Sequence, residues 1–165
     1  MGYTTDFEGS VEVSPPLNEA ERSFLHDLAT TRRMSRTYGP LFVKGEGFAG
    51  QGHSPDVTDY NSPDETQPGL WLQWIPSEDG ASIEWDGGEK FYYSEEWMAY
   101  LINNLLAPSG RKYVEEHAAA SGDERLSQFT FDHTVNGTIS AQGEDPDDQY
   151  NIIVNNNAVV VEYTR

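Results

Sequence analysis

Three carboxylates that lie close together in the sequence, Glu84, Asp86 and Glu89, have the type and spacing that could support catalysis. Paired carboxylates act as general acid and general base when burial separates their pKa values, and clustered carboxylate oxygens bind Ca²⁺ or Mg²⁺. Alternate residues of a strand share one face, so Glu84 and Asp86 can form such a pair. A small hydrolase or a metal-dependent enzyme is therefore one hypothesis. We favour the alternative that these residues form a polar strand face and a hairpin turn.

Other motifs with known chemistry give weaker indications. Residues 45–50 read Gly-Glu-Gly-Phe-Ala-Gly, a G-x-G-x-x-G pattern. Residues 51–55 (QGHSP) predict a continued loop. A dinucleotide-binding site requires a helix directly after the glycine motif. The four histidines match no metal-binding spacing, and the chain has no cysteine. We therefore expect no cofactor and no tightly bound metal.

A stretch rich in glycine, proline and aspartate, residues 39–69, is the segment in which we expect the function to reside. Structureless loops longer than about 15 residues are uncommon in compact domains and are often functional. Its aromatic side chains indicate a loop packed against the sheet, because disordered segments contain few aromatics. We predict a ligand-binding cleft here, with contributions from Phe48, Asp56, Asp59, Tyr60, Asn61 and Trp71. A narrower alternative is an aromatic platform of Trp71 with Tyr92 or Tyr93.

The charge of the chain limits its partners. Asp+Glu is 28 and Lys+Arg is 10, which gives a net charge of -18. Such a charge repels a phosphate backbone and an anionic membrane, so we expect no direct binding to a nucleic-acid backbone and no membrane association. It favours basic partners or cations. The acid-rich segment 46–96 is a candidate negative surface, although we favour a merely solvated face.

Cysteine usage and hydropathy indicate a cytoplasmic protein. The cysteine count is 0, which excludes disulfides and fits a reducing compartment. Residues 1–9 lack the basic and apolar regions of a signal peptide, and no window approaches the about 18 consecutive apolar residues of a membrane span. We therefore expect a cytoplasmic protein without a membrane-spanning segment.

Hydrophobic periodicity and capping signals predict two main helices. The first is expected over residues 18–35, where Asn18 is a good N-cap and Glu21 completes a capping-box pattern. The second is expected over residues 94–107, which contain an amphipathic apolar stripe. A third, weaker helix is expected over residues 111–120.

Alternating apolar and polar residues predict an antiparallel sheet. The strands are expected at 9–14, 41–43, 70–75, 82–85, 90–93, 135–142, 150–154 and 158–163. The order of elements matches the ferredoxin-like βαββαβ arrangement, followed by a C-terminal β-hairpin. We therefore predict a single α+β domain over residues 1–165.

Several strings of residues resemble segments of one protein family. They are residues 1–7 (MGYTTDF), 15–17 (PPL), 59–61 (DYN), 67–71 (QPGLW) and 84–91 (EWDGGEKF). Together they look like a family of small uncharacterised proteins from bacterial and phage genomes, and the resemblance extends over nearly the whole chain. It implies a stand-alone cytoplasmic domain. It implies no activity and no role for any residue.

These patterns favour a non-catalytic, acidic binding protein that captures a protein or a small ligand through residues 44–71 and the adjoining sheet. In a phage setting the captured partner could be a host factor. The enzyme that uses the carboxylate cluster is the alternative, and a mimic of DNA is a third hypothesis. A binder or an enzyme needs a concave site with convergent polar groups, whereas a mimic needs a charged convex surface.

Overall fold

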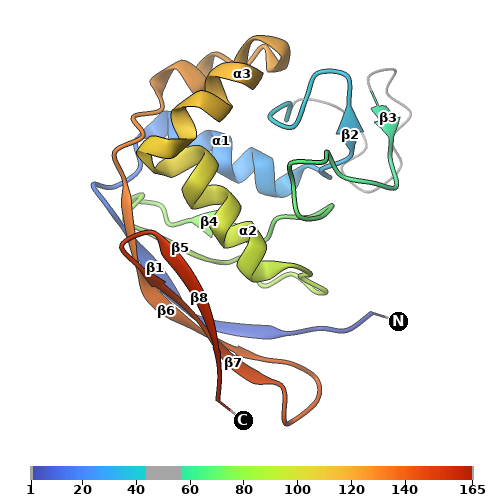
Figure 1. The fold of residues 1–165 in the computed structure, drawn as a ribbon, viewed down its shortest axis with the longest axis vertical. Coiled ribbons are helices and arrows are strands. Elements are labelled where there is room, and N and C mark those ends of the chain that lie inside the picture. Colours follow the sequence, from blue (N-terminus) through green and yellow to red (C-terminus); the bar gives the residue numbers. More distant parts are fainter. Residues whose placement is uncertain (1, 44–56, 165) are drawn as a thin grey trace.

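The protein has an α+β architecture in which helices pack on one face of an antiparallel sheet (Figure 1). The computed structural model describes residues 2–43 and 57–164. Within these residues the main sheet has six strands in the order β4-β5-β1-β6-β7-β8, and every neighbouring pair is antiparallel. The strands are β1 (Asp6–Ser14), β4 (Trp74–Pro76), β5 (Ser82–Trp85), β6 (Thr134–Gln142), β7 (Gln149–Asn155) and β8 (Ala158–Tyr163).

A second, smaller sheet and three α-helices complete the described part of the fold. Strands β2 (Ser35–Arg36) and β3 (Val57–Asp59) pair apart from the main sheet. The helices are α1 (Glu19–Thr30), α2 (Ser94–Leu101) and α3 (Arg111–Ser121), with the short π-helical and 3₁₀ segments η1 (Ile102–Leu106), η2 (Pro108–Gly110) and η3 (Glu124–Gln128). The predicted α+β class with an antiparallel sheet is confirmed.

The exact ferredoxin-like order is not confirmed. The elements β1, α1, β4, β5, α2 and β6 follow one another as predicted, but β2 and β3 are inserted after α1. A further insertion after α2 contains η1, η2, α3 and η3. The C-terminal strands β6, β7 and β8 pair in sequence, as the alternating pattern predicts.

Helix α1 begins where the sequence predicts and ends earlier. The Asn18 side chain accepts a hydrogen bond from the Glu21 backbone N–H at 2.8 Å, and the Glu21 carboxylate accepts one from the Asn18 N–H at 2.8 Å. This reciprocal pair is a capping box. The helix ends at Thr30 and not at residue 35, because the backbone of Thr31 is extended.

The buried side chain of Arg33 accounts for the path of the chain after α1. Its guanidinium donates hydrogen bonds to the carbonyl oxygens of Thr31, Pro40 and Phe42 at 3.1, 3.0 and 3.0 Å. Burial lowers the pKa of Arg33 to about 10, so the group stays charged at neutral pH. A buried charge is costly unless it is hydrogen-bonded. The following loop therefore turns around the guanidinium, and the strand predicted at 41–43 does not form.

Two other predicted strands are shortened or absent. The strand predicted at 70–75 begins only at residue 74. Residues 90–93 form no strand, because Lys90 and Tyr93 have φ values of 56° and 60°, in the left-handed region that a strand does not use. This turn contributes to a pocket instead.

The helices predicted after residue 93 are present. The chain continues from α2 into the π-helical turn η1, which carries it to residue 106, close to the predicted end at 107. The third predicted helix is α3, which ends at Gly122 with a φ of 68°. Glycine adopts this left-handed cap at little cost.

The core lies between the helices and the inner face of the sheet. Along β1, Val11 and Val13 are buried, whereas Ser10 and Glu12 between and beside them are exposed. This alternation places apolar side chains under the helices and polar ones in solvent. The main sheet therefore has one covered face and one solvated face.

Candidate functional site

A pocket opens between two segments that are far apart in the sequence, residues 63–71 and the turn at 89–93. Its volume is about 660 Å³, within the range of small-molecule sites, about 300–1,000 Å³. Its lining consists of Pro63, Pro68, Gly69, Leu70, Trp71, Glu89, Lys90, Tyr92 and Tyr93, and we call it the aromatic pocket. The structure thus brings together the platform of Trp71, Tyr92 and Tyr93 that the sequence offered as a narrower alternative.

The two tyrosines of the aromatic pocket are exposed to solvent. Tyr92 is 48% exposed and Tyr93 is 54% exposed. Aromatic rings provide much of the energy of cores and interfaces, because each of them buries a large apolar area. The exposed rings of Tyr92 and Tyr93 therefore provide apolar surface that a bound ligand can cover.

The backbone of the aromatic pocket is strained at two positions. Lys90 and Tyr93 have positive φ values, which cost a non-glycine residue about 1–2 kcal/mol. Tyr93 is the N-cap residue of α2, and its carbonyl oxygen accepts a hydrogen bond from the Trp97 N–H at 2.8 Å. Strained residues of this kind cluster at functional sites. At Tyr93 a backbone conformation that suits glycine is occupied by a tyrosine, whose side chain lines the pocket.

A chain of hydrogen bonds fixes the wall formed by residues 63–71. Its members, in order, are Gln67, Tyr100, Tyr113, Thr66 and Asp64. The Thr66 hydroxyl donates to the Asp64 carboxylate at 2.6 Å, so Tyr113 must donate to Thr66 and Tyr100 to Tyr113. Burial raises the pKa of Tyr100 well above its usual value, which keeps it protonated as a donor. Each group therefore has a defined role, and the wall is tied to α2 and α3.

A buried glutamine, Gln73, fixes the opposite wall. Its Nε2 donates to the Glu89 carbonyl oxygen at 2.9 Å, and its Oε1 accepts a hydrogen bond from Trp85 Nε1 at 3.2 Å. Its own carbonyl oxygen accepts one from the Asp86 N–H at 3.0 Å. No functional role was predicted for Gln73. The sequence signal that could have identified Gln73 is its position in the apolar run 70–75. A polar side chain that is buried in such a run needs hydrogen-bond partners.

A buried hydrogen-bond donor lies behind the pocket wall at Gly69. The Trp97 indole N–H is buried and has no hydrogen-bond partner among residues 2–43 and 57–164. A Cβ on Gly69 would lie 3.5 Å from this nitrogen and 3.2 Å from Tyr93 Cδ2. A side chain at Gly69 would therefore press on the Tyr93 ring, and glycine allows the two segments to approach each other.

Asp59, Tyr60 and Asn61, which were predicted to bind ligand, are not among the residues that line the aromatic pocket. Asp59 Oδ1 accepts a hydrogen bond from the Asn61 N–H at 2.9 Å, which closes a local turn. Tyr60 is 50% exposed, and its carbonyl oxygen accepts two hydrogen bonds from Arg32 at 3.1 and 3.3 Å. Trp71 does line the pocket. Outside the described residues lie Phe48, Asp56 and the glycine motif at 45–50.

The three carboxylates considered for catalysis have different surroundings. Glu84 lines a groove beside α1, and Glu89 lines the aromatic pocket. Asp86 Oδ1 accepts a hydrogen bond from the Gly88 N–H at 2.8 Å, and burial raises the pKa of Asp86. In the part of the chain that the structure describes, no group of three or more His, Asp or Glu side chains could hold a metal ion. Glu84 and Glu89 therefore lie in different pockets, and Asp86 lines neither of these two.

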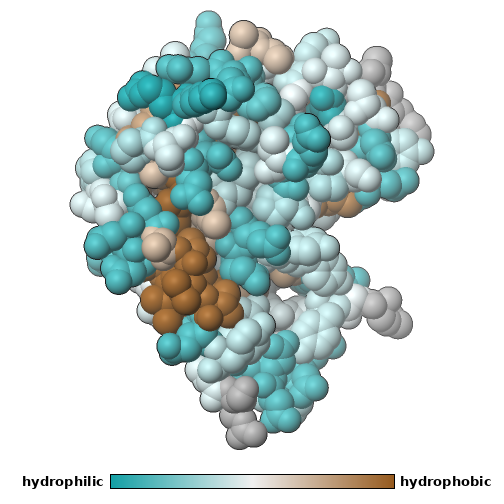
Figure 2. All heavy atoms as spheres, in the orientation of Figure 1, coloured by the Kyte–Doolittle hydropathy of each residue, from teal (hydrophilic) through white to brown (hydrophobic). Residues whose placement is uncertain are grey.

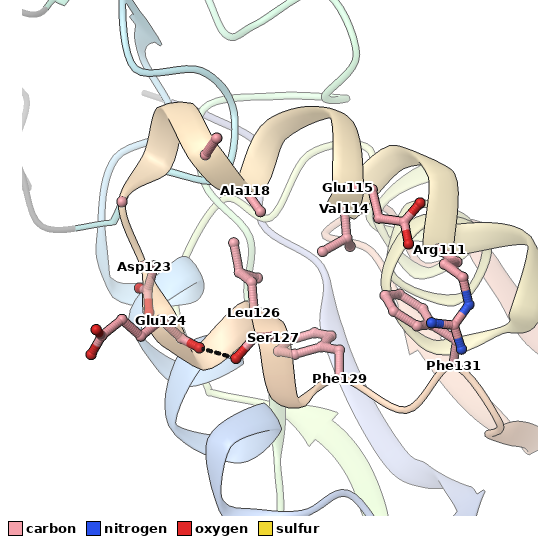
Figure 3. A pocket seen from close by; sticks show the side chains of 12 residues that line it. Arg111, Val114, Glu115, Ala118, Asp123, Glu124, Leu126, Ser127, Phe129 and Phe131 are labelled. Carbon is pink, nitrogen blue, oxygen red and sulfur yellow. Dashed lines mark hydrogen bonds between the residues drawn. The ribbon is translucent and has the colours of Figure 1, made fainter.

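A second hollow, of about 430 Å³, lies beside α3 (Figure 3). The Arg111 guanidinium lies over the ring of Phe131, 4.9 Å from its centroid, and Phe129 beside it is buried. The Ser127 hydroxyl donates to the Glu124 carbonyl oxygen at 2.8 Å. These aromatic and polar groups already have partners within the fold. The hollow is therefore a weaker candidate for a ligand site than the aromatic pocket.

Apolar surface is also present at the edge strand β8. Figure 2 shows a hydrophobic patch where β8 lies in Figure 1, on a face that is otherwise mostly hydrophilic. Val160 and Tyr163 are 55% and 66% exposed. Neither residue lines the aromatic pocket or the hollow beside α3. Glu162 lies between them and is exposed, and charges at sheet edges oppose pairing with other chains.

A buried histidine–glutamate pair is a further candidate for acid–base chemistry. His133 Nε2 lies 2.9 Å from Glu21 Oε2, and His133 Nδ1 lies 2.7 Å from the Pro15 carbonyl oxygen. An ionised carboxylate and a carbonyl only accept hydrogen bonds, so both ring nitrogens donate and the ring is an imidazolium. The side chains of His133 and Glu21 are 1% and 0% exposed. A substrate therefore cannot reach the pair, which ties α1 to the segment before β6.

The pKa values of this pair are shifted in opposite directions. Burial lowers the pKa of His133, but the hydrogen bonds to Glu21 and Pro15 and the charge of Glu21 outweigh burial, so the pKa is raised above 6.5. Burial raises the pKa of Glu21, but hydrogen bonds from His133 and from the backbone N–H groups of Asn18 and Thr130 outweigh it, so the pKa is lowered below 4.5. Both shifts favour the charged pair in the folded state.

The stabilisation by His133 should depend on pH. A raised folded-state pKa gives a contribution that is complete below pH 6.5 and is lost as the pH rises through the folded-state pKa. We expect the difference in free energy of unfolding between the wild type and His133→Gln to shrink on this alkaline side. Urea denaturation at a series of pH values measures it, with the exposed His26→Gln as control. A difference that stays constant as the pH rises would contradict the charged state of His133.

No protein-family model matches the chain, and no curated protein or solved structure matches it either. The resemblance to small bacterial and phage proteins therefore stays a prediction. Among the helices in the described ranges, none combines the length and the apolar character that crossing a bilayer requires.

Proposed function

We propose that the protein is a non-catalytic binding protein that captures a small organic ligand in the aromatic pocket. The observation that carries the proposal is the meeting of Trp71, Tyr92 and Tyr93 around one hollow of about 660 Å³. About half of each tyrosine is exposed, and a ligand that covers these rings gains apolar burial. Of the residues expected to form the binding cleft, Trp71 lines the aromatic pocket, whereas residues 59–61 are not part of the proposed site.

The rigidity of both walls supports this proposal. Hydrogen bonds of Gln67 hold one wall to Tyr100, and hydrogen bonds of Gln73 hold the turn at residue 89. Small-molecule sites are usually largely pre-formed. A pre-formed site avoids part of the entropy cost of ordering its side chains when the ligand binds.

We also propose that the protein works in the cytoplasm. Support comes from the cysteine count of 0, which suits a reducing compartment, and from the net charge of -18, which favours solubility. The same charge makes a nucleic-acid backbone an unfavourable partner. A neutral or cationic ligand is compatible with it.

Substitution of Tyr93 by glycine tests the site directly. Tyr93→Gly removes one ring and places glycine at a positive φ, so the free energy of unfolding should stay within about 1 kcal/mol of the wild type. Indole is a neutral probe that stacks on aromatic rings. We expect indole to give saturation-transfer signals with the wild type and to lose at least half of that signal with Tyr93→Gly.

Tyr163→Ala is the matched control, because it removes an exposed tyrosine ring outside the aromatic pocket. It should leave the indole signal unchanged. The proposed function would be wrong if the folded wild type gave no indole signal. It would also be wrong if Tyr163→Ala reduced the signal as much as Tyr93→Gly does.

A further inference from the structure

The side chains that line the aromatic pocket accept hydrogen bonds at three places, the Glu89 carboxylate and the hydroxyls of Tyr92 and Tyr93. Its side chains are mostly rings, prolines and leucine, and its charged members are Glu89 and Lys90. A primary ammonium group has three N–H donors that need acceptors, whereas a quaternary ammonium group has none. Aromatic faces carry negative electrostatic potential and attract cations, most strongly over tryptophan. The lining therefore suits a bulky cation that requires no hydrogen bonds.

The charge around the pocket supports a cationic ligand. Glu89 and Lys90 have opposite formal charges, so the lining by itself is neutral. The field at the pocket is then set by the rest of the chain, whose net charge is -18. A field of this sign raises the local concentration of cations and their association rate. It disfavours anionic ligands of the same size.

The stem of Lys90 lies at the side of the pocket where the N-terminal segment passes. Its Cδ and Cε lie 2.7 and 3.0 Å from the position that a Cβ on Gly2 would take. Beside it, the Tyr92 hydroxyl accepts a hydrogen bond from the Tyr3 N–H at 3.2 Å. These contacts place the apolar stem against backbone. Glu89, which also lines the pocket, has a formal charge opposite to that of Lys90.

We infer that the aromatic pocket binds a small molecule with a quaternary ammonium group. The inference rests on the proposed function, because it names the class of ligand for the same pocket. The cation is held by the faces of Trp71, Tyr92 and Tyr93 and by the carboxylate of Glu89. The volume of about 660 Å³ leaves room for a substituent that carries the rest of the molecule.

Two probes of nearly equal shape, one cationic and one neutral, distinguish the contribution of the ligand's positive charge to binding from the contribution of its apolar surface. Choline has a quaternary ammonium group, and 3,3-dimethylbutan-1-ol has a neutral carbon in its place. We expect choline to bind about tenfold more tightly than the neutral probe. Chemical-shift titration of the ¹⁵N-labelled full chain measures both dissociation constants. Trp71→Ala and Tyr93→Gly should each weaken choline binding at least about tenfold, because each removes one aromatic face.

Variants of the two charged lining residues should act in opposite directions. Glu89→Gln should weaken choline binding about threefold, and Lys90→Gln should strengthen it about threefold, because each removes one partly screened charge. Neither change should alter the affinity for the neutral probe. Added salt should reduce the affinity for choline and not that for 3,3-dimethylbutan-1-ol.

The two proposals can fail separately. Equal affinities for choline and the neutral probe, both lost in Tyr93→Gly, would overturn the inference about charge and leave the binding function standing. Binding of choline that survives both Trp71→Ala and Tyr93→Gly would also overturn the inference. If the folded wild type gave no indole signal, the proposed function would be wrong, and the inference that rests on it would fail with it.

Discussion

Replacing Glu21 with alanine should lower the free energy of unfolding by about 3–5 kcal/mol, the usual cost of removing one partner of a buried ion pair. The His133 imidazolium would remain buried and would keep three oxygen partners, the Pro15 carbonyl at 2.7 Å, the Thr130 hydroxyl at 3.1 Å and the Asp132 carboxylate at 3.7 Å. The backbone N–H groups of Asn18 and Thr130 would lose the carboxylate oxygens that accept from them at 2.8 and 3.2 Å. The expected loss is therefore larger than that for an ordinary helix residue.

Urea denaturation at pH 6 measures this effect, because His133 is charged there. Glu19→Ala is the matched control: Glu19 is also in the first turn of α1 but is exposed. Both changes remove the same interaction with the helix dipole, and the control should cost less than about 1 kcal/mol. Equal losses for the two variants would show that the buried pair contributes nothing beyond the helix dipole.

Replacing Trp74 with alanine should lower the free energy of unfolding by about 3–5 kcal/mol. Trp74 is 1% exposed, and its ring meets Phe7 and Phe91 edge to face at centroid distances of 5.1 and 5.0 Å. Its indole N–H donates to the Ser94 carbonyl oxygen at 2.8 Å. Phe91 and Ser94 flank the two tyrosines of the aromatic pocket, so we also expect this variant to lose affinity for indole.

Two milder variants separate the contributions to this effect. Trp74→Phe keeps a ring in the core but leaves the Ser94 carbonyl oxygen without its donor, which should cost about 1–3 kcal/mol. Trp85→Phe is the comparison, because it also removes an indole hydrogen bond, to Gln73 Oε1 at 3.2 Å, but from a side chain that is only partly buried and whose ring lies 5.5 Å from that of Phe7. It should cost less than Trp74→Phe in thermal and urea denaturation. The reverse order would contradict the role assigned to the buried indole.

Much of the fold could be predicted from local patterns. The capping box at Asn18 and Glu21, the helices after residue 93 and the paired C-terminal strands depend on residues close together in the sequence. Such contacts are encoded by spacing alone. Predictions of this kind were wrong where the hydrogen bonds of a buried side chain set the path of the backbone. Arg33, for example, draws its neighbours into a loop that ends α1 early and replaces the strand expected at 41–43.

The candidate site could be predicted only in part. The sequence marked Trp71 with Tyr92 or Tyr93 as a possible platform, because the strand expected at 70–75 is apolar on both faces and must be either covered or part of a pocket lining. It could not indicate that Gln67 and Gln73 hold the two walls, because their partners lie in other segments. It also favoured residues 59–61, whose side chains form local turns and exposed surface and do not line the pocket.

The sequence by itself determined the α+β class, the acidic charge and the main helices, because periodicity, capping and composition act over short distances or over the whole chain. Only the tertiary structure decided which aromatic residues meet. Gly69 allows close approach of the two segments, and the left-handed backbone of Tyr93 directs its ring to the same hollow. These features depend on the packing of residues 63–71 against residues 89–93. A pocket between distant segments exists only after the chain has folded, so its ligand class could be inferred only from the assembled walls.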